Sequence, residues 1–228
     1  PSVAPGEVVV IDEPWAIPAV HIYLPPGYSK ARRYSVLYTA DGSAWNRFIR
    51  LPTILDNLIA DRAITPVIAV MIDATADRSD WYSWNPQYLA YLARVVAYVD
   101  QHYLTFPEAR HRLHMGSSAG GRAALQAGLL RPDLFGNVAL FSPSLASSPH
   151  VLAPYFLGEK RPARNLRVWM SVGTMEGSIV EDVKLLDRYL ARVHVSHRVV
   201  YTAAGHNIGT WRHVTRDALT YFYSSPAR

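Results

Sequence analysis

The segment around Ser118 constrains the fold of this chain more than any other. Residues 116–121 read Gly-Ser-Ser-Ala-Gly-Gly, and this Gly-x-Ser-x-Gly pattern lies between an apolar stretch that ends at Met115 and a helix-like run at 123–130. A tight turn from strand to helix leaves no room for side chains two residues before and after the serine, and Gly116 and Gly120 meet that demand. The pattern therefore predicts a sharp turn that exposes the Ser118 hydroxyl at the N-terminus of a helix.

The rest of the chain alternates between short apolar runs and stretches with helical periodicity. We expect strands at Glu7–Ile11, Ala19–Leu24, Ser35–Ala40, Val67–Ile72, Leu113–Met115, Val138–Phe141, Leu166–Val172 and Arg198–Thr202. We expect helices at Thr53–Ala60, Pro86–Tyr103, Val183–Val193 and Trp211–Phe222. Together with the serine turn, this order predicts an α/β-hydrolase fold, a mainly parallel sheet of about eight strands with helices on both faces. The Pro- and Ser-rich segment 142–164 is expected to be an irregular binding loop or lid.

Length and composition indicate a single catalytic domain over residues 1–228. Half of the 228 residues (50%) are hydrophobic and 18% are charged, which is typical of a globular protein. No apolar run reaches the roughly 20 residues that would span a bilayer. No targeting segment is visible either, so a cytoplasmic location is the default expectation, although the chain begins at Pro1. The absence of cysteine excludes disulfides, thiolate metal sites and a cysteine nucleophile.

The net charge of +5 arises in the second half of the chain, and most of its basic residues are arginines. Two interpretations fit this bias: a solvated basic surface, or attraction of a small anionic substrate. We expect no nucleic-acid partner, because no basic block is interleaved with aromatic residues. We also expect no membrane partner, no metal and no cofactor. His111 and His114 would point to opposite faces of a strand, and the pair His194 and His197 has no third ligand in view.

A serine hydroxyl is a weak nucleophile until a histidine takes its proton and an acid holds that histidine. In the α/β-hydrolase fold these residues follow the chain order serine, acid, histidine. His206 comes directly after the last expected strand and follows Gly205, which favours it over the other histidines. Glu176 lies in the loop after the preceding strand, as the acid should. Glu181 and Asp182 remain alternatives, although negative charge at a helix N-terminus would also explain them.

The carboxyl ends of the expected strands also supply candidate binding groups. For the oxyanion hole we expect the amide of Ala119 and that of Gly42 or Ser43. Open α/β sheets bind ligands at this edge, so aromatic and basic side chains in its loops are candidates for the substrate pocket. These candidates are Trp45, Arg47, Arg78, Trp81, Trp211 and Arg212. Each tryptophan has an equally simple alternative role as cover for the edge of the core.

The order of several motifs resembles the esterase family that includes esterase D, feruloyl esterases and enterochelin (enterobactin) esterases. The motifs are Tyr23-Leu24-Pro25-Pro26-Gly27-Tyr28, Val36-Leu37-Tyr38-Thr39-Ala40-Asp41-Gly42 with Trp45, Pro66–Asp73, the serine turn, Arg131–Gly136, and Gly205-His206 with Trp211-Arg212. They run in order over nearly the whole chain. Within the family, the stretches Asp41–Trp45, Leu51–Leu55 and Ile72-Asp73-Ala74 with Arg78 are most similar to the catalytic domain of enterochelin esterases.

This resemblance implies serine-esterase chemistry on catecholate siderophore trilactones or other aromatic esters, and Glu176 matches the acid position of that branch. The chain departs from the branch at Ala204-Gly205-His206, where Gly-Gly-His is usual. The same three residues would serve an acyltransferase or a cyclising thioesterase, and a general or feruloyl carboxylesterase is a further alternative. A non-catalytic binding protein is disfavoured, because serine, acid and histidine are all present in the required order.

Overall fold

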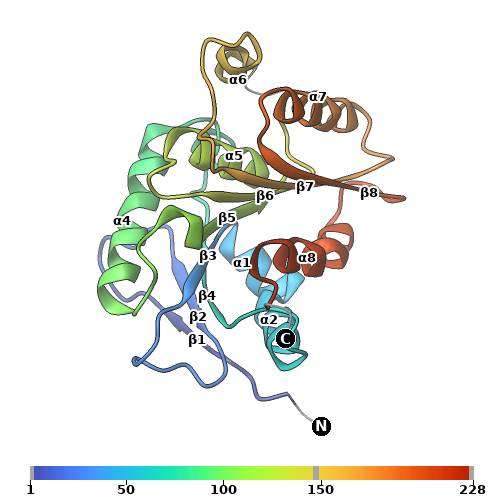
Figure 1. Cartoon of the computed structure of the whole chain (residues 1–228). Helices are drawn as coiled ribbons and strands as arrows, with labels where there is room; N and C mark the ends of the chain where they lie inside the picture. Colours follow the sequence, from blue (N-terminus) through green and yellow to red (C-terminus); the bar gives the residue numbers. More distant parts are fainter. Residues whose placement is uncertain (1–2, 146–148, 226–228) are drawn as a thin grey trace.

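The computed structural model describes residues 3–145 and 149–225, and for residues 149–151 it describes the backbone alone. Its core is one eight-stranded sheet with the order β1-β2-β4-β3-β5-β6-β7-β8 (Figure 1). The strands are β1 (Glu7–Val10), β2 (Val20–Leu24), β3 (Ser35–Ala40), β4 (Val67–Ile72), β5 (Arg112–Ser117), β6 (Asn137–Phe141), β7 (Arg167–Gly173) and β8 (Ser196–Thr202). β1 and β2 pair antiparallel, and all pairings from β4 to β8 are parallel. The predicted α/β-hydrolase fold is confirmed.

Helices cover both faces of this sheet (Figure 1). One face carries α4 (Pro86–His102), α5 (Ala119–Leu130) and α7 (Ser178–Arg192), and the other carries α2 (Leu51–Ala60) and α8 (Ile208–Tyr223). Side chains of a strand alternate between its two faces. In β3, Val36 and Tyr38 accordingly join the core with α4 and α5, whereas Leu37 joins the core with α2 and α8. The near-continuous apolar strands follow from burial on both sides.

The expectation for segment 142–164 is wrong in part, because α6 (Pro149–Phe156) lies within it. Proline is favoured in the first turn of a helix, and Leu152 and Tyr155 bury against the core under α5 and α7. Residues 146–148 of the expected loop lie outside the described residues. Four short helical turns were not expected from the sequence: α1 (Gly42–Ala44), the π-helical η1 (Trp45–Ile49), α3 (Arg78–Trp81) and the 3₁₀ turn η2 (Ala109–His111). Segments this short carry no readable periodicity.

The parallel strands bring the loops after β3, β5, β6, β7 and β8 to one edge of the sheet. Those loops carry Asp41, Ser118, Ser142, Glu176 and His206. Ligands of open α/β sheets bind at this carboxyl edge. No helix within the described ranges combines the length and apolarity needed to cross a membrane.

Candidate active site

Ser118 lies at the sharp turn between β5 and α5. Its backbone has φ 56° and ψ −120°, a conformation that residues other than glycine rarely adopt. The Ser118 N–H donates to the Phe141 carbonyl at 2.8 Å. A Cβ at Gly116 would stand 2.4 Å from the Gly120 carbonyl oxygen, and one at Gly120 would stand 2.8 Å from Asp41 Oδ2. Backbone atoms thus leave no room for a side chain at Gly116, Asp41 crowds position 120, and the predicted turn is present.

Glu176 and His206 meet beside this turn. The imidazole Nδ1 of His206 lies 2.6 Å from Glu176 Oε2. Glu176 follows β7, and its side chain has no exposed surface, whereas the His206 side chain is 35% exposed. Glu181, one of the alternative acids considered from the sequence, lies on the first turn of α7 and pairs with Lys184, and Asp182 lies on the same helix. Glu176 is thus the acid that contacts His206.

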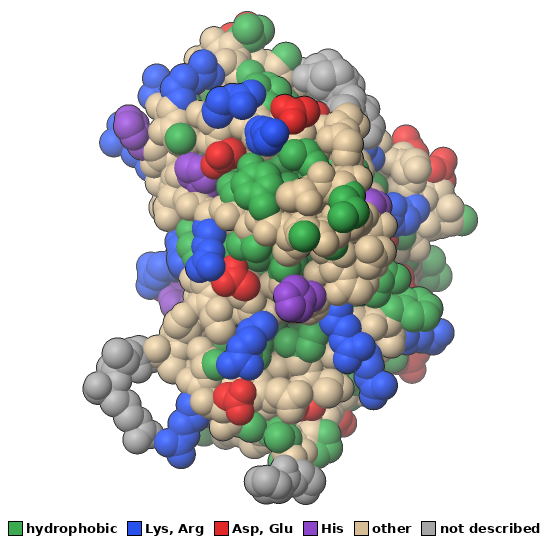
Figure 2. Space-filling model, turned by 90° about the vertical axis from the view of Figure 1, so that its right-hand side faces the viewer, with side chains coloured by type: hydrophobic (Ala, Val, Ile, Leu, Met, Phe, Trp, Pro, Cys, Tyr) green, Lys and Arg blue, Asp and Glu red, His purple; other side chains and the backbone are tan. Residues whose placement is uncertain are grey.

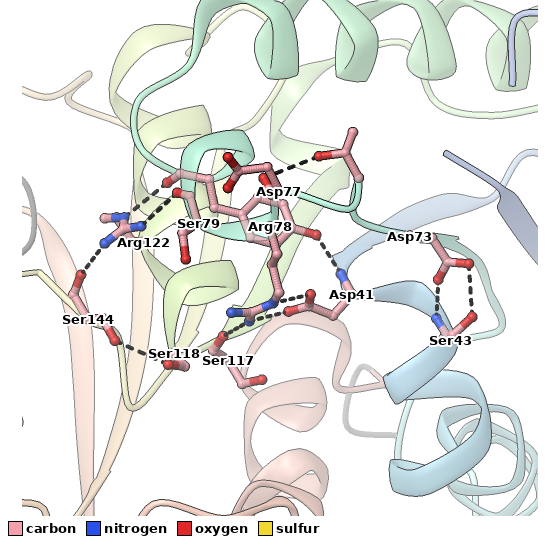
Figure 3. Close-up of polar contacts among 12 residues, drawn as sticks. Asp41, Ser43, Asp73, Asp77, Arg78, Ser79, Ser117, Ser118, Arg122 and Ser144 are labelled. Atoms are coloured by element: carbon pink, nitrogen blue, oxygen red, sulfur yellow. Dashed lines mark hydrogen bonds and ion pairs between the residues drawn. The ribbon is translucent and has the colours of Figure 1, made fainter. Parts of the chain in front are cut away.

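The Ser118 hydroxyl has a different partner in this structure. Its Oγ lies 3.1 Å from Ser144 Oγ, and the Ser144 N–H donates to the Ser118 carbonyl at 3.1 Å (Figure 3). In the described part of the chain, no hydrogen bond joins Ser118 to His206. Catalytic hydrogen bonds are often long without substrate and tighten when it binds. A nucleophile, a base and a buried acid are therefore present at one edge of the sheet. The contact between Ser118 and His206 is the one that is not yet formed.

The predicted oxyanion donors differ in their availability. Ala119 begins α5, so its amide lies at a helix N-terminus next to Ser118. The Ser43 amide donates to Asp73 Oδ1 at 2.5 Å and its hydroxyl donates to Oδ2 at 2.8 Å (Figure 3). Ser43 is therefore occupied in this structure, because Asp73 at the end of β4 binds both its donors. Gly42 is buried against the backbone of β4, where a Cβ would come 2.4 Å from the Met71 carbonyl carbon.

Arg78 reaches the serine turn through Asp41. Its Nε and Nη2 donate to the two Asp41 oxygens at 2.6 and 2.7 Å, and Nη2 also lies 3.4 Å from the Ser117 carbonyl oxygen (Figure 3). The hydrogen bonds to Asp41 raise the pKa of Arg78. The Arg78 side chain is 40% exposed, compared with 12% for Asp41. Arg78 thus lies at the serine turn with two of its nitrogens already paired, and its contact with substrate stays a prediction.

Two of the predicted pocket residues are placed elsewhere. The Trp45 side chain is fully buried and packs against Phe141 with ring centroids 5.0 Å apart, so the expectation that it contacts substrate is wrong. Trp81 is 9% exposed and packs against Tyr88 in the core below α4, so the expectation that Trp81 contacts substrate is wrong as well. Both indoles follow the general tendency of large aromatic side chains to fill a core.

The remaining predicted pocket residues fall into two groups. Arg47 and Arg212 are exposed, and Arg212 lines a hollow of about 210 Å³ with residues of α2 and α8. Trp211 is half-buried and lies edge-on to His206, with ring centroids 5.0 Å apart and an angle of 90° between the planes. Only Trp211 of this set contacts His206.

Arg122 belongs to this site, although the sequence did not indicate it. It is 3% exposed, and its guanidinium donates to the Ser144 carbonyl at 3.2 Å (Figure 3). It also donates to the Tyr82 carbonyl at 3.0 Å and to Ser83 Oγ at 3.0 Å. Burial lowers the pKa of Arg122, and the positive charge of Arg78 lowers it further. Its position one turn after the serine in an apolar helix was the available signal.

Ser142 and Ser144 were also missed, although they directly follow β6 at the carboxyl edge of the sheet. Ser142 donates to Glu176, and Ser144 contacts Ser118. Their place next to the strand of the serine turn was the signal for both. Within the described ranges, no group of three His, Asp or Glu side chains gathers as a metal site would require.

Comparison with known proteins shows the family of this chain. The family model described as "Putative esterase" matches residues 17–221. The chain belongs to this esterase family. This membership makes the protein a carboxylic ester hydrolase.

This esterase is similar to several characterised relatives. It is 26% identical over 223 residues to an iron(III) salmochelin esterase of Escherichia coli, covering 88% of this chain and 53% of that protein. The fold is similar to that of the enterobactin esterase of Shigella flexneri, with a TM-score of 0.84 and 22% identity over 96% of this chain and 58% of that one. It is also similar to a ferulic acid esterase structure, with a TM-score of 0.81 and 17% identity over 96% of this chain and 99% of that one. The chain thus spans little more than half the length of the siderophore esterases.

Proposed function

We propose that this esterase hydrolyses an aromatic ester, of the catecholate siderophore type, through an acyl-enzyme on Ser118. The observation that carries the chemistry is the contact of 2.6 Å between His206 Nδ1 and buried Glu176 beside the strained serine. Because Nδ1 faces a carboxylate, the proton of neutral His206 is held at Nδ1 and Nε2 is left free to accept.

The reaction follows from these placements. Ser118 Oγ leaves Ser144, gives its proton to His206 Nε2 and forms a bond to the ester carbonyl carbon. His206 then gives that proton to the alkoxide of the leaving alcohol as the ester bond breaks. A water molecule enters, passes its proton to His206 and attacks the acyl carbon, so that the acid is released and Ser118 is restored.

The negative oxygen of each tetrahedral intermediate needs donors on the side of the α5 N-terminus. The Ala119 amide is the first of these, because it points from the helix end next to the nucleophile. Arg78 adds positive charge above the turn, although Asp41 neutralises part of it. We assign the second donor to the amide of Gly42 at the start of α1, since the amide of Ser43 is bound to Asp73.

The substrate class is inferred from the relatives and from the character of the site. A salmochelin esterase is similar over 88% of this chain, which supports an aromatic siderophore ester. The exposed part of the Arg78 side chain offers a cation beside the serine turn, where its Nη2 lies 3.4 Å from the Ser117 carbonyl oxygen. On the face in Figure 2, Lys and Arg side chains are spread among neutral and acidic ones, which suits a small ligand better than a long polyanion.

Hydrolysis of hydroxycinnamoyl esters is the second candidate. The observation in its favour is the match to a ferulic acid esterase over 99% of that chain, so the two folds correspond almost completely in extent. The same Ser118 and His206 would act, and only the acyl group would differ.

A panel of esters tests both candidates. Purified protein and the Ser118→Ala variant are assayed with p-nitrophenyl acetate and butyrate, methyl ferulate, and a catecholate trilactone with and without iron. We expect a kcat/KM for the trilactone at least a hundredfold above the simple esters, which corresponds to about 3 kcal/mol of transition-state binding. Ser118→Ala should lose at least about a thousandfold in kcat with every ester.

Each other result has a defined meaning. A preference for methyl ferulate would replace the siderophore substrate by a hydroxycinnamoyl ester. Full activity of Ser118→Ala would overturn the acyl-enzyme. If no ester were hydrolysed while a fluorophosphonate still labelled Ser118, the acyl group would be passed to an acceptor other than water.

A further inference from the structure

The hydrogen bonds around Glu176 continue to two residues outside the proposed triad. Glu176 Oε2 contacts His206, while Oε1 lies 2.7 Å from Ser142 Oγ and 2.6 Å from the Gly173 nitrogen. An ionised carboxylate only accepts hydrogen bonds. Ser142 must therefore donate its single hydroxyl proton to Glu176, and the direction of that bond is fixed.

The oxygen of Ser142 still has lone pairs that can accept a hydrogen bond, and Trp211 donates one to it. Trp211 Nε1 lies 3.0 Å from Ser142 Oγ, and an indole N–H can only donate. Every proton in the series Trp211 to Ser142 to Glu176 is thus assigned without ambiguity. Hydrogen bonds that run in one direction polarise and strengthen each other.

The position of Ser142 is held from its backbone. Ser142 is fully buried, its N–H donates to the Ser171 carbonyl at 2.8 Å, and its φ is 46°. A non-glycine residue in the left-handed region is uncommon and costs free energy. Glycine would fit this backbone conformation with less strain, so what serine adds at this position is its hydroxyl.

Trp211 contacts the base as well as the acid. It lies in the first turn of α8, its N–H donates to Ser142, and its ring stands edge-on to the imidazole of His206. The same side chain therefore touches one end of the Glu176–His206 pair directly and the other end through Ser142.

We propose that Ser142 and Trp211 are positioning residues for catalysis, which act as one unit to hold the Glu176 carboxylate in the plane that His206 Nδ1 requires. Without the Ser142 bond, Oε1 keeps one donor, the Gly173 amide, and the carboxylate can turn about its last side-chain bond. This inference rests on the proposed roles of Ser118, Glu176 and His206, and it holds for any ester that they cleave.

The test compares kcat and KM of Ser142→Ala, Ser142→Gly, Trp211→Phe and the double variant Ser142→Ala/Trp211→Phe, with p-nitrophenyl acetate as substrate. We expect each single variant to lose about tenfold or more in kcat with KM unchanged within twofold. The double variant should be no worse than Ser142→Ala within about threefold, because Trp211 acts on Glu176 through the Ser142 hydroxyl. The rate of Ser118 labelling by a fluorophosphonate should fall in parallel.

Ser171→Ala is the matched control. Ser171 is also a buried serine on the adjacent strand, and its hydroxyl has no hydrogen-bond partner in the described part of the chain. We expect its kcat to stay within twofold of the original. Ser142→Gly separates positioning from stability, because glycine adopts φ 46° without strain and the variant should fold at least as well as Ser142→Ala.

Three outcomes would overturn the proposal. Losses in the single variants that multiply in the double variant would mean that the two residues act independently. A raised KM with unchanged kcat in Trp211→Phe would make Trp211 a wall of the substrate pocket instead. Full kcat in a folded Ser142→Gly would remove Ser142 from the mechanism. A protein that hydrolyses p-nitrophenyl acetate but neither the trilactone nor methyl ferulate would refute the proposed substrates and leave this test intact.

Discussion

Glu176 is a buried carboxylate, and its hydrogen bonds explain how the fold tolerates it. A charge without exposed surface is costly unless it is paired and hydrogen-bonded. Gly173 donates at 2.6 Å from the end of β7, where a Cβ would collide with the Ala204 carbonyl oxygen at 2.2 Å. The absence of a side chain at Gly173 thus allows the β7 and β8 loops to approach each other and bring Glu176 to His206.

Replacing Glu176 by glutamine tests this arrangement. A neutral amide cannot stabilise the imidazolium that forms on His206, and it no longer fixes the proton at Nδ1. We expect Glu176→Gln to lower kcat by about 10²–10⁴-fold, with KM little changed. Steady-state kinetics on p-nitrophenyl acetate, together with circular dichroism to confirm folding, measure this effect.

Glu181→Gln is the control for that variant. Glu181 lies on the first turn of α7 and pairs at the surface with Lys184. Its kcat should match the original within twofold. Equal losses in the two variants would show that Glu176 is not the acid of the site.

At this scale the sequence predicted the residues whose chemistry follows a fixed chain order. Ser118, Glu176 and His206 could be located because each follows a strand that the apolar pattern reveals. Trp45 and Trp81 could not, since a tryptophan after a strand can turn into the core or toward a ligand with the same local sequence. Ser142 was missed because Ser-Pro-Ser is also an ordinary loop sequence, and only its position directly after β6 marks it as part of the site.

Among the elements, helix α5 positions the site through its N-terminus and through the side chain of Arg122. Its N-terminus carries Ser118, and Arg122 one turn later donates to the loop after α3 and to the Ser144 loop after β6. A planar guanidinium can reach several acceptors in fixed directions. Arg122 thereby ties the two loops that flank the nucleophile to the same helix.

Arg122→Lys should loosen this connection. An ammonium group cannot reach the Tyr82 and Ser144 carbonyls and the Ser83 hydroxyl together, so some buried acceptors lose their donor. We expect a decrease of about 1–3 kcal/mol in the free energy of unfolding, measured by urea denaturation. Activity should fall as well, because Ser144 contacts the nucleophile.

Arg131→Lys provides the comparison, since Arg131 is paired with Asp133 at the surface, at the end of the same helix. An exposed ion pair contributes little, so its substitution should change stability by less than about 0.5 kcal/mol. If the two variants shifted the urea midpoint equally, the buried hydrogen bonds of Arg122 would contribute no more to stability than a surface ion pair.

The elements themselves were predictable to different degrees. Strands and long helices carry an apolar pattern over many residues, and all eight strands were found from it. Helix α6 was not, because Pro149 and Pro154 within eight residues suggest a loop, and its Leu152 and Tyr155 are explained only by the core that they cover. Tertiary burial overrides the local signal there.

The stability of the whole molecule is linked to pH through His114, a histidine buried in the sheet interior. His114 lies in β5, is fully buried between α4 and the loop that holds Phe135, and contacts the hydroxyl of Tyr88 through Nε2. Burial lowers the pKa of His114 from 6.5 to about 3. The folded protein therefore keeps this imidazole neutral at pH values where an unfolded chain would protonate it.

This linkage predicts acid sensitivity with a definite sign. Between pH 6.5 and about 3 the unfolded state binds one proton more than the folded state at His114, so stability falls as pH falls, by at most ~1.4 kcal/mol per pH unit. Above pH 6.5 the residue contributes no slope. We expect roughly 2–3 kcal/mol of stability to be lost at pH 4.5 through this residue, measured by urea unfolding from pH 7.5 to 4.5.

The variant His114→Gln cannot titrate, so its stability should depend less on pH over this range even if it is less stable at pH 7.5. His102→Gln is the control, because His102 is exposed at the end of α4 and should leave the slope unchanged. Parallel curves for the original and His114→Gln would mean that the core admits the proton or that other groups dominate. A flatter curve for His114→Gln alone would assign the loss of stability of this esterase in acid to the buried histidine of β5.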